Sequence, residues 1–591
     1  MKSLLTLTAI CSLLTPFASF TAAAADQTLN FIVILVDDLG RHDLGCYGSK
    51  FHLTPNLDRL AAQGMRFTQA YSACTVCSPT RAALLTGKYP ARLHVTDWIE
   101  GHKRPQAKLK VPDWTMHLPA NERTIAASLK SAGYATASIG KWHLGGPEFT
   151  PEKFGFDVNL GGTSKGQPPS YFSPYKIATL PDGPNGEFLT DREATEAVKF
   201  IEANKDKPFF IYLPHHAVHT PLQGKKEVVE KYRARIKPGS GQTNAVYAAL
   251  LESVDDGIGR ITAKLDELKL AERTVILFTG DNGGLIGPTS NAPLRVGKGS
   301  AYEGGVAVPL IVRWPGVTTA GGVNTTPVIS ADFAPTLLEL AGIKPAPNQI
   351  FDGVSLAPLF KGGANLARPL FWHYPHYHPG GATPYGAIRD GDFRLVEFYE
   401  DGRLELYDLK NDARESKNLA ADEPEKALAL QKKLDAWRRS VGAQMPSPNP
   451  NYRPNPQAAG GDILLHSRVA EVHGATLRYE PQPNKNTLGF WVKKEDWASW
   501  DFTVEKPGAF ILEALQGCGK GSGGAEVEFA IGDQKLTMIV QDTGHFQNFV
   551  PRDLGTVKFE KAGLYTLTVK PKTKPGVAVM DLRQVTLKPA K

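Results

Sequence analysis

The sequence predicts an α/β fold in which a large mixed, mostly parallel sheet is flanked by helices and followed by smaller β-rich parts. Apolar runs rich in β-branched residues recur, beginning at residues 30–36, and segments of helical periodicity separate them. Such runs are typical of parallel strands that are buried on both faces. The helical periodicity ends at a Pro/Asn-rich stretch, residues 445–461, so we expect an all-β region after it.

The N-terminal residues have the pattern of an export signal. Lys2 precedes an apolar run over residues 4–20, and small residues that suit a cleavage site follow at Ala22–Ala25. The run is too short and too interrupted by Ser, Thr and Pro for a membrane span, and the sequence offers no other candidate span. We therefore predict a signal peptide over residues 1–25, no transmembrane segment, and an exported protein that is periplasmic or secreted.

Composition narrows the classes of function. The 591 residues are 42% hydrophobic and 21% charged, an ordinary globular composition. The net charge of +7 is modest, and no basic cluster with interleaved aromatic residues indicates a nucleic-acid partner. Of the five cysteines, Cys11 lies in the signal peptide, and the others are too few for a disulfide framework. Cys74 and Cys77 form a CxxC, but no second CxxC completes a zinc site.

Predicted strands and helices alternate through the first part of the chain, as in open α/β sheets. Each predicted strand is a short apolar run, and each predicted helix has apolar residues at helical spacing. The predicted strands cover residues 30–36, 66–73, 134–139, 208–213, 274–278 and 306–313, and the predicted helices cover residues 56–64, 122–132, 190–204 and 244–270.

Four of these strands end in loops that carry acidic, basic or amide side chains. Because the carboxyl ends of parallel strands meet at one edge of an open sheet, we expect these side chains to converge although they lie far apart in the sequence. In chain order they are Asp37 and Asp38, then Lys141 and His143, then His219, and finally Asp281 and Asn282.

The acidic members of this group predict a metal site. Adjacent carboxylates at the end of a buried strand are costly unless a cation or hydrogen bonds compensate them. Asp37, Asp38, Asp281 and the amide of Asn282 all offer hard oxygen ligands. Because no cysteine and no histidine at metal-binding spacing accompanies them, calcium or magnesium is favoured over zinc.

A short helix is predicted next to Cys77. Ser78 suits the N-cap, Pro79 the first helical position and Gly87 the C-terminal cap. Cys77 is then expected just outside the helix N-terminus, where free N–H groups favour an anion, with Arg81 about one turn inside. A nucleophilic sulfur, a guanidinium and this helix end together suit a tetrahedral oxyanion. The alternative is a structural cysteine buried before a helix.

A further basic candidate is Lys298, which follows a Gly-rich loop after Asp281. Because it lies between Gly297 and Gly299, its ammonium can approach an anion with little side-chain crowding. The alternative is a surface lysine in a loop.

The segment from Cys77 to Gly87 also resembles the sulfatase signature, in which Cys-x-Pro-x-Arg is followed by Leu-Thr-Gly. Further segments resemble the rest of the family's motifs and keep their order: Gly140–Gly145, His219–Pro221, Gly280–Gly283 and Gly297–Gly299. The resemblance covers about residues 28–440 and implies an alkaline-phosphatase-like fold for that part of the chain.

This resemblance implies a sulfuric ester hydrolase whose nucleophile is formylglycine, made from Cys77 by a formylglycine-generating maturation enzyme. It also implies one calcium ion, held by Asp37, Asp38, Asp281 and Asn282 and touching the modified Cys77. Asp281 would in addition accept the proton of the attacking hydroxyl.

The resemblance also assigns roles to the basic residues. Arg81 would hold the formylglycine, and His143 would take the proton of its second hydroxyl. Lys141, Lys298 and His219 would neutralise and orient the sulfate. Assistance to the leaving alcohol falls to His219 or Lys298, and the sequence leaves the division between them open.

From residue 369 the pattern changes to that of a small antiparallel subdomain, residues 369–444, which would complete the sulfatase-like catalytic domain of residues 26–368. Residues 371–378 are aromatic and His-rich, strands are predicted over residues 385–388, 393–399 and 403–409, and a helix is predicted over about residues 422–440. Four residues here are candidates for substrate contacts, although packed or solvated histidines are equally consistent with the sequence: His373, His376, His378 and Arg389.

Residues 445–461 are predicted to be a linker, and residues 462–591 a β-sandwich. This last part loosely resembles the carbohydrate-binding modules of secreted polysaccharide enzymes. Trp497 and Trp500 would stack on sugar rings if exposed, although a core position is favoured. The predicted strands cover residues 488–492, 500–504, 509–514, 525–531, 535–540, 564–569 and 577–582.

The predicted substrate is a sulfate monoester of a carbohydrate, because an export signal and a sugar-binding module favour a sulfated polysaccharide or its oligosaccharides. One alternative is a phosphomonoester or phosphonate hydrolase of the same superfamily, because phosphate resembles sulfate in shape. The other is a non-catalytic protein that binds sulfated glycans, against which the intact set of motif residues argues.

Overall fold

The computed structural model describes residues 28–590, apart from residues 102–103, 106, 364–365, 380–381, 475, 481 and 483. The predicted signal peptide lies outside the described residues. The chain forms two compact units, of which the first comprises the described residues up to Gly101 together with Asp113–Gln444. The second comprises the described residues of the intervening segment, up to Pro112, and those from Met445 onwards. In the described part of the chain, no helix has both the length and the apolar character needed to span a bilayer.

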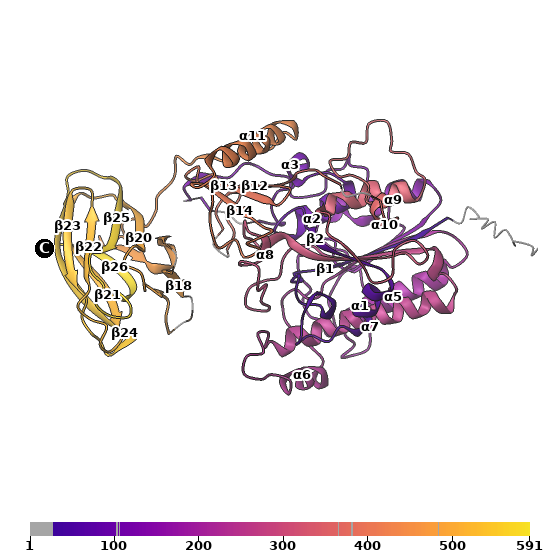
Figure 1. Ribbon diagram of the computed structural model, residues 1–591, viewed down its shortest axis with the longest axis horizontal. Helices are drawn as coiled ribbons and strands as arrows, with labels where there is room; N and C mark the ends of the chain where they lie inside the picture. Colours follow the sequence, from indigo (N-terminus) through magenta and orange to yellow (C-terminus); the bar gives the residue numbers. More distant parts are fainter. Residues whose placement is uncertain are drawn as a thin grey trace, which may run out of the picture. The chain divides into compact units, whose positions relative to one another are not determined.

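The first unit is built on a mixed sheet of nine strands within the described residues (Figure 1). The strands are β1 (Asn30–Val36), β2 (Met65–Tyr71), β4 (Ala135–Ile139), β5 (Val158–Leu160), β6 (Phe209–His215), β7 (Thr274–Gly280), β8 (Ala307–Arg313), β9 (Gly322–Asn324) and β10 (Val328–Ile329). Their order is β10-β2-β8-β7-β1-β6-β4-β5, with β9 paired to β2. Strands β7, β1, β6, β4 and β5 run parallel, whereas β8 is antiparallel to both of its neighbours, which confirms the predicted mixed, mostly parallel sheet.

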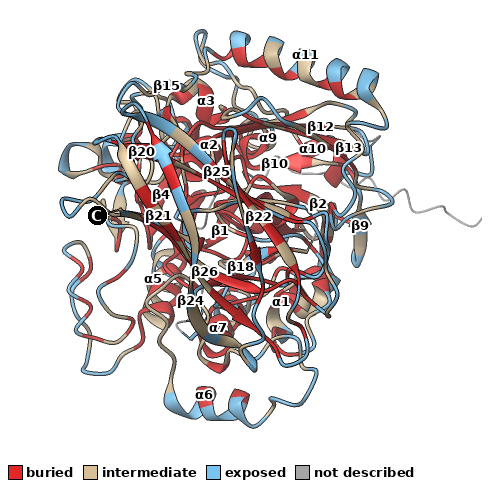
Figure 2. Ribbon diagram, turned by 90° about the vertical axis from the view of Figure 1, so that its left-hand side faces the viewer, coloured by how far each residue is buried: buried red, intermediate tan, exposed pale blue. Residues whose placement is uncertain are grey.

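Helices cover both faces of this sheet (Figure 1). They are α1 (Pro55–Gln63), α2 (Cys77–Thr86), α3 (Pro90–Leu93), α4 (Ile125–Ser131), α5 (Leu189–Ala203), α6 (Lys226–Arg233), α7 (Ala245–Glu267), α8 (Glu303–Val306), α9 (Phe333–Leu340) and α10 (Ala357–Phe360). Alternate residues of β1 face the two layers: Ile34 packs in one core with residues of α1, α5 and α7, and Val33 in the other with residues of α2, α4 and α9. This double cover explains the unbroken apolar run of β1, which is buried throughout (Figure 2).

A second, four-stranded antiparallel sheet completes the first unit, in the order β11-β12-β13-β14. Its strands are β11 (Leu370–Tyr374), β12 (Tyr385–Asp390), β13 (Phe393–Phe398) and β14 (Leu404–Asp408), and it is covered by α11 (Pro424–Ser440). The rings of Phe371 and Trp437 stack at a centroid distance of 4.8 Å, which fixes α11 against β11. The predicted antiparallel subdomain and its helix are therefore confirmed.

The second unit contains two antiparallel sheets with a shared apolar core. One has the order β18-β19-β26-β21-β24 with β16 paired to β26, and the other the order β17-β20-β25-β22-β23. The strands are β16 (Ile463–His466), β17 (Glu471–His473), β18 (Arg478–Glu480), β19 (Thr487–Gly489), β20 (Trp497–Val504), β21 (Gly508–Cys518), β22 (Glu526–Ile531), β23 (Gln534–Ile539), β24 (His545–Phe559), β25 (Gly563–Pro571) and β26 (Asp581–Pro589). A small ladder of β3 (Leu109–Lys110) with β15 (Ser447–Pro448) also belongs to this unit, so part of the predicted linker is paired.

The strand predictions in this unit are incomplete. The strand predicted at residues 577–582 begins only at Asp581, and the one predicted at residues 488–492 ends at Gly489. The short strands β16, β17 and β18 and the long strand β24 are absent from the prediction. Strand β24 is an edge strand that contains Pro551 and Gly555, and its residues are mostly exposed or half-buried, so it lacks the apolar run that marks a central strand. Trp500 is buried in the core, whereas Trp497 is half-buried and stacks on a neighbouring histidine ring.

Candidate active site

Helix α2 begins two residues earlier than predicted. Cys77 is its first residue and Val76 is the N-cap, so the predicted N-cap Ser78 and the placement of Cys77 outside the helix are wrong. The Ser78 hydroxyl instead accepts a hydrogen bond from the backbone N–H of Ile99 at 3.2 Å, so it holds a neighbouring loop rather than its own helix end. The predicted cap at Gly87 is confirmed, because this residue has a φ of +74° at the end of the helix.

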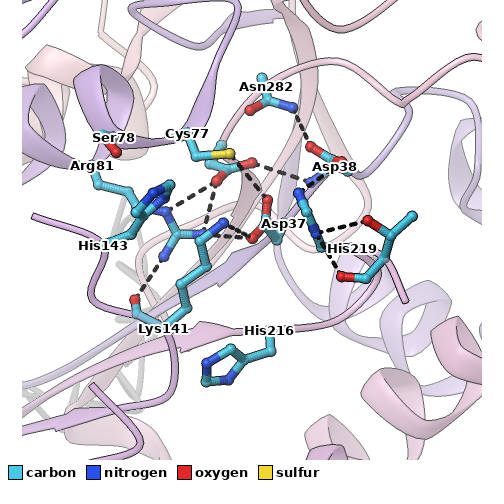
Figure 3. A network of polar contacts seen from close by, with 12 residues as sticks. Asp37, Asp38, Cys77, Ser78, Arg81, Lys141, His143, His216, His219 and Asn282 are labelled. Atoms are coloured by element: carbon cyan, nitrogen blue, oxygen red, sulfur yellow. Dashed lines mark hydrogen bonds and ion pairs between the residues drawn. The ribbon is translucent and has the colours of Figure 1, made fainter. Parts of the chain in front are cut away.

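The strand-end residues gather around Cys77 (Figure 3). Side-chain atoms of Asp37, Asp38, Cys77 and His219 that can bind a metal all lie within 4.8 Å of one another. The sulfur of Cys77 is 3.5 Å from Oδ1 of Asp37. The two aspartates follow β1 and His219 follows β6, and these strands are parallel neighbours. The topology therefore brings together side chains that are remote in the sequence.

Arg81 connects α2 to two other strand ends. Its Nε and Nη2 donate to Oδ2 of Asp281 at 3.1 and 2.8 Å, and its Nη1 donates to the carbonyl oxygen of Lys141 at 2.7 Å. The other carboxylate oxygen of Asp281 accepts from the backbone N–H of Asp38 at 3.2 Å. Because Arg81 is fully buried and its fork is engaged on both sides, its position is fixed by the fold.

Two ammonium groups complete the charged shell of the site. Lys141, which is fully buried, pairs with Oδ2 of Asp37. The ammonium of Lys298 lies 2.7 Å from Oδ1 of Asp38 and 3.5 Å from the Cys77 sulfur. The sulfur therefore has a carboxylate and an ammonium at the same distance.

The two histidines have hydrogen bonds that define their ring nitrogens. His143 Nε2 bonds to the carbonyl oxygen of Ile99, and because a carbonyl only accepts, the neutral ring keeps Nδ1 as an acceptor. This Nδ1 is buried and has no hydrogen-bond partner among the described residues. His219 Nδ1 lies 2.8 Å from the Thr220 carbonyl oxygen, and its Nε2 is 3.7 Å from Oδ2 of Asp38.

Burial and charge set the protonation of the site. Burial would raise the pKa of Asp37, but Lys141 and the other nearby cations outweigh it and hold that pKa well below its usual range. Burial, together with the charge of Asp37, raises the pKa of the Cys77 thiol to about 12. Burial lowers the pKa of His143 well below its usual value, and Lys141 adds to this effect. Burial and Asp37 raise the pKa of Asp281 to about 6.

The oxygens of this cluster fit a hard cation. Oδ2 of Asp38 and Oδ1 of Asn282 are buried and, within the described residues, have no hydrogen-bond partner. The Asn282 amide nitrogen donates to the other Asp38 oxygen at 2.8 Å, which leaves the amide oxygen available. Buried oxygens without partners are costly unless a ligand compensates them. With Asp37 they form the carboxylate and amide set that calcium prefers, and Asp281 lies beside them.

Two of the predicted substrate contacts are engaged by the protein itself. His373 is buried, with Nδ1 2.8 Å from the Tyr399 hydroxyl and Nε2 2.9 Å from the Gln444 carbonyl oxygen. Arg389 is also buried and binds the Tyr71 hydroxyl. The structure thus gives these two side chains structural partners rather than bringing them to the Cys77 cluster.

The other two predicted contacts, His376 and His378, have different neighbours. His376 is buried, with Nε2 2.8 Å from the hydroxyl of Thr96. The ring of His378 packs on Gly299, where a Cβ would lie only 2.0 Å from Nδ1 of the ring. His378 therefore packs against the loop that carries Lys298.

Sequence reasoning missed two residues that contact the site's loops. The Tyr171 hydroxyl lies 2.6 Å from the carbonyl oxygen of His216 and 3.0 Å from that of His219, and no motif marks this tyrosine. Glu193, on α5, contacts the end of β6. Its signal is an acidic residue within the buried stripe of an amphipathic helix.

Comparisons with protein families agree with this geometry. A family model described as Sulfatase matches residues 29–343, which is more than half of the chain. A second, described as N-sulphoglucosamine sulphohydrolase, C-terminal, matches residues 296–440.

Individual relatives extend the same result. The chain is 35% identical over 503 residues to a sulfatase of Formosa agariphila, which covers 71% of this chain and 90% of the relative. It is 34% identical over 385 residues to N-acetylgalactosamine-6-sulfatase of Canis lupus familiaris, which covers 60% of this chain and 70% of the relative. The crystal structure of Ps i-CgsB, also solved with k-i-k-neocarrahexaose, matches with a TM-score of 0.61 and 30% identity over 70% of this chain and 93% of that chain. This chain therefore belongs to the sulfatase family and is a sulfuric ester hydrolase.

Proposed function

We propose that this sulfatase is exported and hydrolyses sulfate monoesters of carbohydrates, using a formylglycine made from Cys77 and one bound calcium ion. The surroundings of Cys77 carry the proposal: its sulfur lies 3.5 Å from Asp37 and 3.5 Å from the Lys298 ammonium. The buried oxygens of Asp38 and Asn282, for which the described part of the chain offers no hydrogen-bond partner, belong to the same cluster. A cation, a carboxylate and spare oxygen ligands around one side chain suit an anionic ester bound beside a metal.

In this proposal, Lys141, Lys298 and His219 bind the sulfate oxygens. A sulfate monoester spreads its negative charge over these oxygens, and cations that the fold holds in place stabilise that charge without reorganising during the reaction. Arg81 keeps residue 77 in position, because Asp281 and the Lys141 carbonyl fix its guanidinium. Asp37, Asp38, Asp281 and Asn282 would hold the calcium ion, which would withdraw charge from the sulfate, and a hydrated formylglycine at residue 77 would supply the attacking hydroxyl.

Three groups handle the protons. Asp281 accepts the proton of the attacking hydroxyl. His143 accepts the proton of the remaining hydroxyl through Nδ1, because its Nε2 is committed to the Ile99 carbonyl. His219 or Lys298 donates to the leaving alcohol.

A carbohydrate substrate is supported by the named relatives, one an N-acetylgalactosamine-6-sulfatase and one solved with a neocarrahexaose. We propose His378 as a substrate contact near the sulfate, since its ring packs on Gly299, the residue after Lys298. The β-sandwich of residues 462–591 is proposed to bind glycan. In the proposed domain organisation it follows a catalytic domain over residues 26–368, a small subdomain over residues 369–444 that completes it, and a linker over residues 445–461. The proposal also includes export through the signal peptide of residues 1–25 and conversion of Cys77 to formylglycine by a separate maturation enzyme.

Two measurements test this function on protein made in a host that has a formylglycine-generating enzyme. Mass spectrometry of the peptide that contains Cys77 is expected to show formylglycine, and an unmodified thiol in an active enzyme would refute the nucleophile. Sulfate release from a panel of sulfated saccharides is compared with phosphate release from the matched phosphate esters. Faster phosphate hydrolysis would favour the phosphoester alternative, and binding without hydrolysis would favour a glycan-binding protein.

A further inference from the structure

A buried carboxylate lies between two histidines just outside the catalytic cluster. Oε2 of Glu193 is 2.6 Å from Nδ1 of His215, and Oε1 is 2.6 Å from Nδ1 of His216. All three side chains are at most 3% exposed. Because an ionised carboxylate only accepts hydrogen bonds, both histidines donate from Nδ1, which fixes the tautomer and orientation of both rings. These three residues are called the His–Glu–His clasp below.

The clasp holds the start of the segment that carries His219. His215 ends β6, and His219 follows four residues later. Between them, the Ala217 carbonyl accepts from the backbone N–H of Asp37 at 2.9 Å, and the Val218 N–H donates to the Asp37 carbonyl at 2.8 Å. A shift of the clasp would therefore move the backbone next to Asp37 as well as the position of His219.

The clasp also lies against the turn that carries Lys141. A Cβ on Gly140 would lie 3.4 Å from Oε1 of Glu193, so the carboxylate is in van der Waals range of this turn. The backbone N–H of Lys141 donates at 2.7 Å to the carbonyl of Pro214, the residue before His215. In the view of Figure 3, His216 lies on the opposite side of Asp37 and Lys141 from Cys77.

The polar character of the clasp has a cost that packing alone does not explain. Nε2 of His215 is buried and, among the described residues, has no hydrogen-bond partner. Burying a carboxylate with two imidazoles is expensive, and apolar side chains of similar volume usually stabilise a core at least as well. A structural role would therefore be served equally well by apolar residues, whereas precise placement of nearby groups requires the directed hydrogen bonds.

We propose that Glu193, with His215 and His216, is a positioning unit that places His219 and Lys141 for sulfate transfer. The clasp touches no substrate and takes no proton from it. The assignment rests on the proposed roles of His219 and Lys141.

The test is a double-mutant cycle between Glu193→Gln and His219→Ala in the full chain, measured by sulfate release from a sulfated saccharide, because a poor leaving group makes the rate depend on assistance from the enzyme. Glu193→Gln keeps the size of the side chain, but its amide group donates towards one histidine and forces that ring to the other tautomer. We expect kcat to fall about 10- to 100-fold, with KM changed less than about threefold, because small displacements of catalytic groups cost rate rather than binding. In the His219→Ala background the same substitution is expected to cost less than in the wild type, and the loss that remains is the part transmitted through Lys141.

Asp255→Asn is the matched control. Asp255 is another buried carboxylate, on α7, and accepts from the backbone N–H groups of Asn56 and Leu57 at 3.0 and 2.7 Å. Its loss is expected to lower the unfolding temperature and to leave kcat and the effect of His219→Ala unchanged. A second pair of variants, at His216, covers the case in which Glu193→Gln does not fold. His216→Asn keeps a hydrogen-bond donor near the position of Nδ1 and is expected to retain most of kcat. His216→Leu lacks this donor and is expected to lose most of kcat.

Three results would overturn the assignment. The first is a Glu193→Gln loss of equal size with and without His219, and the second is a loss confined to the unfolding temperature. The third is equal activity of His216→Asn and His216→Leu. If the wild type is active and His219→Ala leaves that activity unchanged, the proposed role of His219 is wrong and this assignment fails with it. This outcome is distinguishable from the three above, in which His219 matters but the clasp does not position it.

Discussion

Oδ1 of Asp37 lies 3.5 Å from the sulfur of Cys77, although 40 residues separate them in the sequence. The contact joins the carboxyl end of the central strand β1 to the first residue of α2. It brings the proposed metal ligand and the proposed nucleophile precursor into one site. The predictions below test what each group around this contact does.

Cys77→Ala is expected to lower sulfate release about 10³-fold or more, because losing a covalent nucleophile removes the reaction path. The unfolding temperature is expected to change by only a few degrees, since one sulfur atom is removed. Sulfate release and thermal unfolding check this. Cys74→Ala is the control, a second buried cysteine three residues earlier, and should keep most of the activity. Substantial hydrolysis by Cys77→Ala would contradict the proposed nucleophile.

Removal of calcium with a chelator is expected to abolish activity and to lower the unfolding temperature, and added calcium is expected to restore both. A ligand at 100 times its Kd stabilises the folded state by about 2.7 kcal/mol. Asp38→Asn should lose this calcium-dependent shift, because Asp38 supplies a buried oxygen that has no hydrogen-bond partner among the described residues. Asp255→Asn should retain it. Thermal unfolding with and without calcium gives the answer, and an Asp38→Asn shift equal to that of the wild type would exclude Asp38 as a ligand.

Arg81→Lys is expected to lower kcat about 100-fold, because one ammonium cannot replace the two donors that Arg81 gives to Asp281. Weakening a fully buried ion pair also costs stability, up to about 3 kcal/mol. Arg92→Lys is a matched control, because Arg92 binds Asp352 through the same two nitrogens, away from the cluster. Steady-state kinetics and urea unfolding measure both effects. Equal loss of kcat in the two variants would argue against a specific role of Arg81.

His219→Ala and Lys298→Ala are expected to differ with the leaving group. The variant that lacks the general acid should lose little activity on an aryl sulfate with an acidic phenol. On a sugar sulfate it should lose about 10²-fold or more, since a poor leaving group needs the proton. The slope of log kcat against leaving-group pKa checks this for both variants. If neither slope changes, the assignment of leaving-group assistance to these two residues is wrong.

Asp581→Asn is expected to stabilise the second unit at pH 8 and to have no effect near pH 3. Burial raises the pKa of Asp581 from 3.8 to about 7, the Glu480 carboxylate adds to the rise, and a hydrogen bond from Gln547 offsets part of it. Because the folded pKa is the higher one, the wild type loses stability as the pH rises from about 4 through about 7, by an estimated 1–2 kcal/mol.

Hydrogen exchange of the backbone amides of β26, measured in the full chain, reports the stability of this unit. Glu505→Gln, at an exposed position, is the control and should show no such pH dependence. Stabilisation by Asp581→Asn that is the same at pH 4 and pH 8 would contradict the prediction.

Much of the first unit could be predicted from local pattern. The apolar run at β1 and the amphipathic stretches at α5 and α7 lie within a few residues of their predicted bounds, because burial on one or both faces leaves a periodic record in the sequence. Strand β24 could not be predicted in this way, since an edge strand with exposed residues leaves no such record.

The N-terminus of α2 shows another limit. Ser78 has the local chemistry of an N-cap, but a distant backbone group, the N–H of Ile99, takes its hydroxyl. His373 illustrates the same effect, because its two ring nitrogens are bound by groups from Tyr399 and Gln444 that no local pattern reveals. In both cases a tertiary partner decides the role of a side chain.

The sequence by itself determined which residues end each buried strand and which motif surrounds Cys77, because strand period and motif spacing are local properties. The tertiary structure alone decided which of the buried groups pair with one another. Arg81 meets Asp281 across 200 residues, and Glu193 meets His216 beneath the catalytic loops. The physical reason is that periodicity reports that a side chain is buried, whereas its charge and hydrogen bonds are completed by whichever chain segment the fold places next to it.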